Sequence, residues 1–224
     1  MTAVLPPSLR ESWGAVGSRT EDVSISLLSI TAETTVYEHA GTLTIGDCDI
    51  QPRSLLEIDV NLSPSLSAIG KSVEDVMSLA ADPAKERFVS LLDEEGITVE
   101  NERSVTEFDR GDGTAGRWYV FETTHPADDG RVDTQTHLAV WPAGDQFAMA
   151  GGTIPLETPP EDALEGEVET ANEVENEAKV EVHPQTDRET IAAFVRARVR
   201  ETVDSTERPE GIDAGAEPGE STLD

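Results

Sequence analysis

The stretch from Gly116 to Pro155 constrains the fold of this chain more than any other part of its sequence. It reads GRWYVFETTHPADDGRVDTQTHLAVWPAGDQFAMAGGTIP and contains two of the three Trp and two of the four His. Its apolar residues recur at a period of two, which is typical of β-strands. Asp129-Gly130 is a strong signal for a two-residue hairpin, because a type I′ turn needs positive φ at both central positions. The stretch therefore predicts consecutive antiparallel strands.

The positions of two turns predict which residues of these strands face each other. A turn centred on Asp129-Gly130 places Tyr119 opposite Val140, and a second turn over residues 142–145 places Val140 opposite Phe147. One face then carries the large apolar side chains Tyr119, Phe121, Leu138, Val140, Phe147 and Met149. We expect this face to be core, because a slip of one residue would move every one of these side chains to the other face.

The opposite face of the same strands mixes aromatic and small side chains. In the predicted register Trp118 lies opposite Trp141, and Glu122 lies opposite His137. The same face also carries Ala139, Ala148 and Ala150. Two Trp and three Ala are unusual on a fully solvated face, and small residues let a helix pack closely. We expect either that a helix covers this face or that it is a binding surface.

Shorter patterns predict the remaining strands and a pair of helices. Strands are predicted over residues 22–30, 35–39, 42–45, 54–60 and 97–108, followed by a flexible loop over 109–116. A first helix is predicted after the N-cap Ser72 and runs to Ala80. Asp82-Pro83 then predicts a second helix, which ends at Gly96.

The last helix has the clearest pattern. Thr186 and Glu189 are spaced as a capping box. Apolar residues then recur every four positions at Ile191, Val195, Val199 and Val203. This spacing predicts a helix with one buried face.

These elements predict one α+β domain, a curved antiparallel sheet with helices packed on it. Residues 1–19 form an N-terminal segment, 20–156 the sheet with its helix pair, and 183–204 the C-terminal helix. Residues 157–182 hold 10 acidic residues and one basic residue, which predicts a low-complexity acidic linker. Residues 205–224 are predicted to be a disordered acidic tail.

The charge balance of the chain is extreme. It has 46 acidic and 16 basic residues, which gives a formal net charge of -30, and only three of the basic residues are lysines. This composition is typical of proteins of halophilic archaea that work in molar salt, where the Debye length falls to about 3 Å and charge repulsion is screened. A field of this sign disfavours nucleic-acid backbones and anionic membrane surfaces.

Several classes of function have no signature in the sequence. No run approaches the ~20 apolar residues of a membrane span, and the N-terminus has no secretory pattern, so we expect a cytoplasmic protein with no membrane insertion. Cys48 is the only cysteine, and His39, His125 and His183 lack metal-ligand spacing, so neither a metal nor a cofactor is predicted. A protein partner stays open, and the sequence does not indicate the oligomeric state.

Three pairs of residues are candidates for a site. Glu122 and His137 could act as a general base and its orienting carboxylate, or simply as a surface ion pair. Trp118 and Trp141 are candidates for binding if their face is exposed. Near the end of the last helix, Arg196 and Arg200 either complement the helix dipole or bind an anion.

The order of the elements, with the segments GRWYVFE, HLAVWPAGDQFAMAGGTIP and IAAFVRARV, resembles the PsbP-like proteins. The resemblance implies an α/β/α sandwich, whose sheet is covered on both faces, and a role as a binding or assembly subunit. It implies no site residue. Because the sequence also shows no nucleophile, metal or phosphate signature, and because its sheet is apolar on both faces and its composition is acidic, we expect a non-enzymatic binding or assembly module of a halophilic archaeon. The alternative is a small hydrolase or isomerase that uses the Glu122–His137 pair.

Overall fold

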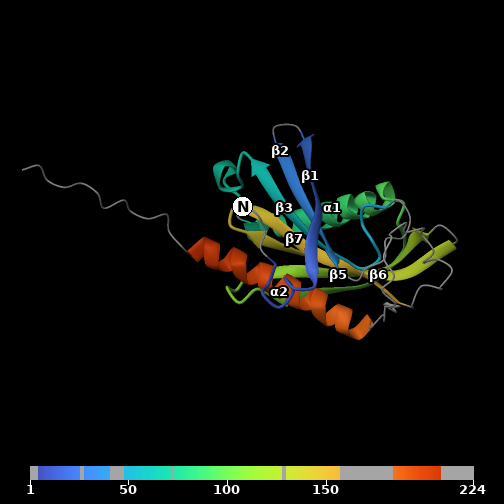
Figure 1. Cartoon of the computed structure of the whole chain (residues 1–224). Helices are drawn as coiled ribbons and strands as arrows, with labels where there is room; N and C mark the ends of the chain where they lie inside the picture. Colours follow the sequence, from blue (N-terminus) through green and yellow to red (C-terminus); the bar gives the residue numbers. More distant parts are fainter. Residues whose placement is uncertain are drawn as a thin grey trace, which may run out of the picture.

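One antiparallel sheet of seven strands forms the centre of the computed structural model, which describes residues 5–25, 28–40, 48–71, 73–127, 130–156 and 184–207. The strands lie in the order β1-β2-β3-β7-β6-β5-β4 (Figure 1). They are β1 (Trp13–Ile25), β2 (Leu28–His39), β3 (Ser54–Ser63), β4 (Thr98–Asp109), β5 (Ala115–Ala127), β6 (Gly130–Ala143) and β7 (Gln146–Pro155). The helices are η1 (Ser67–Ile69), α1 (Val73–Glu94) and α2 (Pro184–Glu207). The predicted α+β class is confirmed.

The two long helices cover opposite faces of the sheet (Figure 1). On β6, Val140 belongs to the apolar core that contains Phe88 of α1. Its neighbour Trp141 belongs to the core that contains Phe194 of α2. Because successive residues of a strand point to opposite faces, the sheet separates two cores, one beneath each helix.

The predicted faces of β5, β6 and β7 are confirmed, but the predicted partners are wrong. Ala127 pairs with Gly130, so the first turn lies one residue earlier in the chain than predicted. Ala143 pairs with Gln146, which makes the second connection shorter than predicted. Each turn error changes the cross-strand partners by two residues, and a change of two keeps every side chain on its face.

The N-terminal part of the sheet differs from the prediction. β1 begins at Trp13, inside the predicted N-terminal segment 1–19, and the predicted strand over 22–30 reverses between Ile25 and Leu28, which pair with each other. The pattern did not reveal this reversal because both arms of a hairpin share the same alternation. The predicted strand over 42–45 lies outside the described residues.

The predicted helix pair is a single helix, α1, with Pro83 inside it. Proline removes a helical hydrogen bond and usually ends or bends a helix. Pro83 is exposed, whereas Ala81 and Phe88 on either side of it are buried against the sheet. Apolar packing on both sides of Pro83 thus holds the helix to one face of the sheet. The predicted cap Ser72 lies outside the described residues.

Helix α2 begins at Pro184, so Thr186 lies inside its first turn and is not the N-cap. Proline at the first helical position is favourable because that position has no helical partner for an N–H group. Ile191, Val195 and Val199 are buried as predicted, whereas Val203 is half-buried. The predicted linker over 157–182 and most of the predicted tail lie outside the described residues.

Candidate functional site

The two candidate tryptophans occupy different environments. Trp141 is fully buried beneath α2, and its Nε1 donates a hydrogen bond to Oγ1 of Thr202, 3.0 Å away. Trp118 is half-buried and pairs with Ala139, not with Trp141. The expectation that a helix covers this face is therefore confirmed for Trp141, and only Trp118 remains near the surface.

The predicted pairing of Glu122 with His137 is not formed. Glu122 lies opposite Gln135 and accepts a hydrogen bond from Nδ2 of Asn101 at 2.5 Å. Its side chain is 41% exposed, and Arg103 lies 3.9 Å away. His137 lies opposite Val120 instead. The cause is the position of the first turn, which moved every partner on β6 by two residues.

His137 takes part in a different network, which fixes Trp118. Trp118 Nε1 donates to Nδ1 of His137 at 3.1 Å, and Nε2 of His137 lies 3.1 Å from Oε1 of Gln135. Because Nδ1 accepts the indole hydrogen, the neutral imidazole carries its proton on Nε2 and donates it to Gln135. The same Gln135 oxygen accepts a bond from Nε of Arg188 on α2, 2.9 Å away. Burial, aided by Arg188, lowers the pKa of His137 to about 4.

A groove between α2 and the hairpin of β4 and β5 contains three of the four predicted binding residues. We call it the arginine groove; its volume is about 570 Å³. The residues that define it are Phe108, Asp109, Arg110, Trp118, Arg196 and Arg200, together with Gly111 and small or aliphatic residues of α2. The charged members are three arginines and one aspartate, a formal charge of 3 − 1 = +2.

Aromatic rings form part of the wall of the arginine groove. Phe108 and Trp118 meet edge to face, with ring centroids 6.4 Å apart. The Phe108 ring lies so close to Gly116 that a Cβ atom at that position would be 2.4 Å from the ring. Glycine at 116 is therefore required if Phe108 is to lie where it does.

Arg110 is a buried cation with incomplete pairing. Its side chain is 4% exposed, and its nearest carboxylate, Asp112, is 3.4 Å away. Nη1 donates to Oγ1 of Thr114 at 3.0 Å, but Nε has no hydrogen-bond partner among the described residues. Burial lowers the pKa of Arg110, with Asp112 opposing the effect. The negative charge of an anion in the groove would offset part of the cost of burying this guanidinium.

Arg196 and Arg200 lie one helical turn apart on α2 and are both exposed. Nε of Arg196 donates to the carbonyl of Ala192 at 3.0 Å. Neither Arg196 nor Arg200 forms an ion pair within the described ranges, although the chain has nearly three acidic residues for each basic one. The helix dipole explains a preference for cations here, but it does not explain why both line the same groove as Arg110.

Arg198, which lies between these two residues, points to the sheet and has a structural role. It forms a buried ion pair with Glu57 of β3, and Glu57 accepts a bond from the hydroxyl of Tyr37 at 3.1 Å. A second ion pair joins Arg53 to the buried Asp187 of α2 at 2.7 Å. Together the two pairs anchor α2 at two points along its length.

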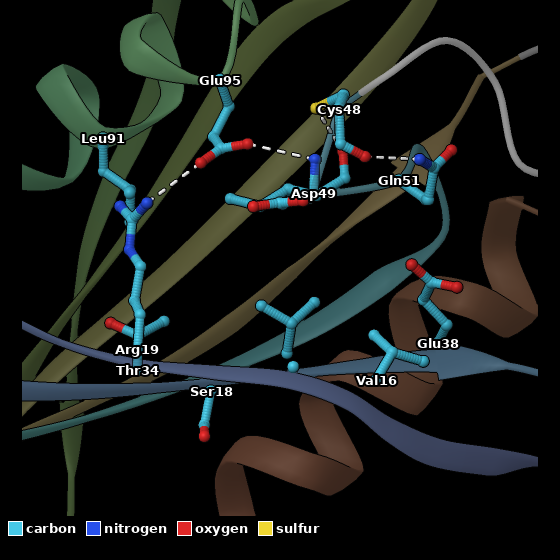
Figure 2. Close-up of a pocket in the computed structure, with 13 residues that line it drawn as sticks. Val16, Ser18, Arg19, Thr34, Glu38, Cys48, Asp49, Gln51, Leu91 and Glu95 are labelled. Atoms are coloured by element: carbon cyan, nitrogen blue, oxygen red, sulfur yellow. Dashed lines mark hydrogen bonds and ion pairs between the residues drawn. The ribbon is translucent and has the colours of Figure 1, made fainter.

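A second cavity, of about 330 Å³, lies between β1, β2 and the end of α1 (Figure 2). Figure 2 shows Arg19 reaching Glu95, at 3.0 Å, while the other oxygen of Glu95 accepts the backbone N–H of Asp49 at 3.1 Å. Cys48 also lines this cavity, and burial raises the pKa of its thiol to about 11. The thiol is therefore protonated at neutral pH and is a weak nucleophile. Several polar groups that line this second cavity already bond to one another and are not available to a ligand. The arginine groove is therefore the stronger candidate site.

Sequence reasoning missed Arg110 because it assigned residues 109–116 to a flexible loop, and it missed Phe108 because this last residue of the predicted strand 97–108 carried no signal of a site. Asp109 accepts the N–H of Gly111 at 2.7 Å, and Asp112 accepts the N–H of Thr114 at 3.0 Å. These local bonds are typical of Asx turns, which Asp and Gly favour in this spacing. The spacing of DRGDGTAG could have indicated an ordered turn, but nothing in it indicated that Arg110 would be buried.

The described residues contain no group of three His, Cys, Asp or Glu placed to hold a metal ion. Among these residues no helix is both long and apolar enough to span a membrane.

The family model described as a domain of unknown function, DUF6517, matches residues 9–197. No curated protein and no solved structure matches the chain.

Proposed function

Because the chain belongs to the DUF6517 family, whose description assigns no activity, we propose a function from the site itself: the protein is a non-enzymatic binding module that takes an anionic ligand in the arginine groove. One observation carries the proposal. Arg110, Arg196 and Arg200 line a single groove in a chain whose formal net charge is -30. Cations in so acidic a chain would be expected to pair with the abundant carboxylates.

The physical chemistry of the three arginines favours an external anion. A buried guanidinium with an unsatisfied Nε has lost hydration without full replacement, which costs free energy. Guanidinium groups bind carboxylates and phosphates through paired hydrogen bonds. An anion between the walls would contact the exposed arginines of α2 and would lie beside Arg110, which follows β4, so that its charge would offset the cost of burying Arg110.

The alternative function, a small hydrolase or isomerase, was based on a pairing of Glu122 with His137 that the structure does not contain. Glu122 bonds to Asn101, and His137 uses Nδ1 to accept the Trp118 indole. A histidine held in this way has no ring nitrogen left to remove a proton from a substrate. The binding role is therefore better supported than a His137-based activity.

Other parts of the proposal rest on composition and layering. The helix–sheet–helix layers support a PsbP-like α/β/α sandwich, and the acid excess supports a cytoplasmic protein of a halophilic archaeon. A protein could also bring the anion, as an acidic side chain on its surface. The volume of the groove lies within the range of small-molecule sites, however, which favours a small ligand.

The proposal is tested by anion binding to matched variants. Inorganic phosphate, benzoate and phenyl phosphate are titrated into the protein in KCl at a concentration where it is folded, with Trp fluorescence and calorimetry as readouts. We expect at least one probe to bind, and the Arg196→Gln/Arg200→Gln double variant to lose about tenfold or more in affinity. Arg103→Gln, whose side chain is 56% exposed and lies outside the groove, is the control and should bind as the parent does. No binding by any probe, or equal binding by the double variant, would refute the proposal.

A further inference from the structure

The arginine groove combines charge with aromatic surface, and this combination restricts the chemistry of its ligand. We infer that the ligand is a small molecule with a planar aromatic ring and a doubly charged anionic group, such as a phosphate monoester. This inference rests on the proposed function. The +2 formal charge of the lining residues is balanced by two negative charges. The Phe108 and Trp118 rings offer apolar contact to a ring of the ligand.

Both walls of the groove supply cations for the anionic group of the ligand. Arg196 and Arg200 are four residues apart on α2, so their guanidinium groups lie on one side of the helix and can bind two oxygens of the same anion. Arg110 approaches from the opposite wall, where Asp112 compensates only part of its charge. A phosphate has three terminal oxygens and can therefore serve both walls, whereas a single carboxylate has two.

Trp118 is held in position before any ligand arrives. Its indole N–H is bonded to His137, and its ring meets both Phe108 and His137 edge to face, with centroids 6.4 Å and 5.9 Å apart. A bulky aromatic side chain with fixed rotamers loses little entropy on binding. A Trp ring held in one orientation is well suited to pack against a flat ligand.

The size of the groove agrees with this ligand class. Its volume of about 570 Å³ exceeds that of a single inorganic anion and lies within the range in which small-molecule sites enclose most of their ligand. A bare anion would leave the Phe108 and Trp118 surfaces in contact with water. A ring attached to the anion would cover them.

The test compares four probes that separate charge from ring. Phenyl phosphate has both a ring and a dianion, inorganic phosphate lacks the ring, benzoate has a ring with one charge, and phenol has the ring alone. We expect phenyl phosphate to bind about tenfold more tightly than inorganic phosphate or benzoate, and phenol not to bind measurably. Trp118→Leu should lower the affinity for phenyl phosphate about tenfold and leave the affinity for inorganic phosphate unchanged.

The outcomes separate this inference from the proposed function. Equal affinity for phenyl phosphate and inorganic phosphate, with both lost in Arg196→Gln/Arg200→Gln, would overturn the aromatic ligand and retain the anion site. Tighter binding of benzoate than of phenyl phosphate would overturn the dianion. Circular dichroism of Trp118→Leu establishes that it is folded; if it is not, Trp118→Phe, which keeps a ring but loses the N–H, should retain most of the ring preference.

Discussion

Beneath α1 the sheet presents large aromatic and aliphatic side chains, whereas beneath α2 it presents alanines beside large residues such as Trp13 and Trp141, together with two largely buried ion pairs. Phe88 and Phe121 meet in the first core at 6.4 Å between centroids. In the second, Arg53–Asp187 and Arg198–Glu57 join α2 to the sheet. Apolar contacts are non-directional and tolerate small shifts of a helix, but a buried ion pair holds only in one geometry.

This difference explains where the candidate site lies. Arg196 and Arg200 are useful only if α2 keeps a fixed rotation and height over the sheet. Arg198, between them in the sequence, is bonded to Glu57 and sets that rotation. The α1 face has no comparable ionic anchor in the described core, and no candidate residue depends on the rotation of α1.

The largest expected effect is that of salt. If KCl falls from a few molar to about 0.1 M, repulsion among carboxylates is no longer screened, and the two acidic segments that flank α2 increase the repulsion near that helix. We expect α2 to lose protection before α1, and the fold to be lost thereafter. Hydrogen exchange followed by mass spectrometry measures both helices in one experiment. Unchanged exchange and an unchanged melting temperature across this range would contradict the halophilic interpretation.

The second prediction removes one anchor of α2. Glu57→Ala leaves Arg198 buried without its main partner, which should lower the free energy of unfolding by about 3–5 kcal/mol. Phe88→Ala, which creates a cavity beneath α1, should cost a similar ~3–5 kcal/mol. The double variant Glu57→Leu/Arg198→Leu should recover most of the loss, because no unpaired charge remains. Urea unfolding at fixed salt measures all three, and a double variant no more stable than Glu57→Ala would show that the charges themselves are not what matters.

The third prediction uses two buried histidines, one on each face. Burial lowers the pKa of His125, on the α1 side, and of His137, on the α2 side, to about 4 in each case. The unfolded chain binds these protons near pH 6.5, so the stability due to each neutral imidazole is complete above pH 6.5 and declines as the pH falls towards 4. The loss should amount to about 3 kcal/mol for each histidine, in a decline of about 1.4 kcal/mol per pH unit.

Matched variants separate the two histidines. His125→Gln and His137→Gln should each reduce the pH dependence of unfolding between pH 6.5 and 4, and NMR titration of the imidazole signals gives each pKa directly. Protonation of His137 should also change Trp fluorescence, because a protonated Nδ1 no longer accepts the Trp118 N–H. An imidazole that titrates near 6.5 in the folded protein would contradict the burial argument for that residue.

The sequence predicted which face of the sheet each side chain occupies much better than it predicted the cross-strand partner of each residue. The alternation in Gly116–Pro155 placed Tyr119 and Trp118 on their correct faces, because face depends only on whether a residue number is odd or even along a strand. The partner of Trp118 depends on the turn, and an error of one residue there replaced Trp141 by Ala139. Period-two patterns cannot detect such an error, since both registers bury the same side chains.

The candidate site was only partly predictable for a related reason. Trp118, Arg196 and Arg200 could be named from composition and helix position, but their meeting in one groove depends on how α2 crosses the sheet. That crossing is set by Arg198 and Glu57, which are far apart in the sequence and carry no local signal of their pairing. The side chain of Arg110 is also buried, and the local sequence does not reveal this.

The smallest expected effect concerns Gln135, which joins α2 to Trp118 without lining the groove. Its oxygen accepts bonds from Arg188 and from His137, whose other nitrogen holds the Trp118 indole. Gln135→Leu should cost about 1–2 kcal/mol of stability, because it leaves the buried His137 Nε2–H without an acceptor. It should also reduce the affinity for phenyl phosphate a few-fold by loosening Trp118, while binding of inorganic phosphate stays as in the parent.

The neighbouring substitution Thr136→Val is the control for this experiment. Thr136 is fully buried on the α1 side of the same strand and bonds to Thr123 and Thr153, so its loss should lower stability to a similar degree. It has no bond to His137, however, and should leave both affinities unchanged. Equal loss of phenyl phosphate affinity in the two variants would show that reduced stability weakens the groove in general. Loss in Gln135→Leu alone would show that the α2 face, through one polar network, positions the ring that the ligand contacts.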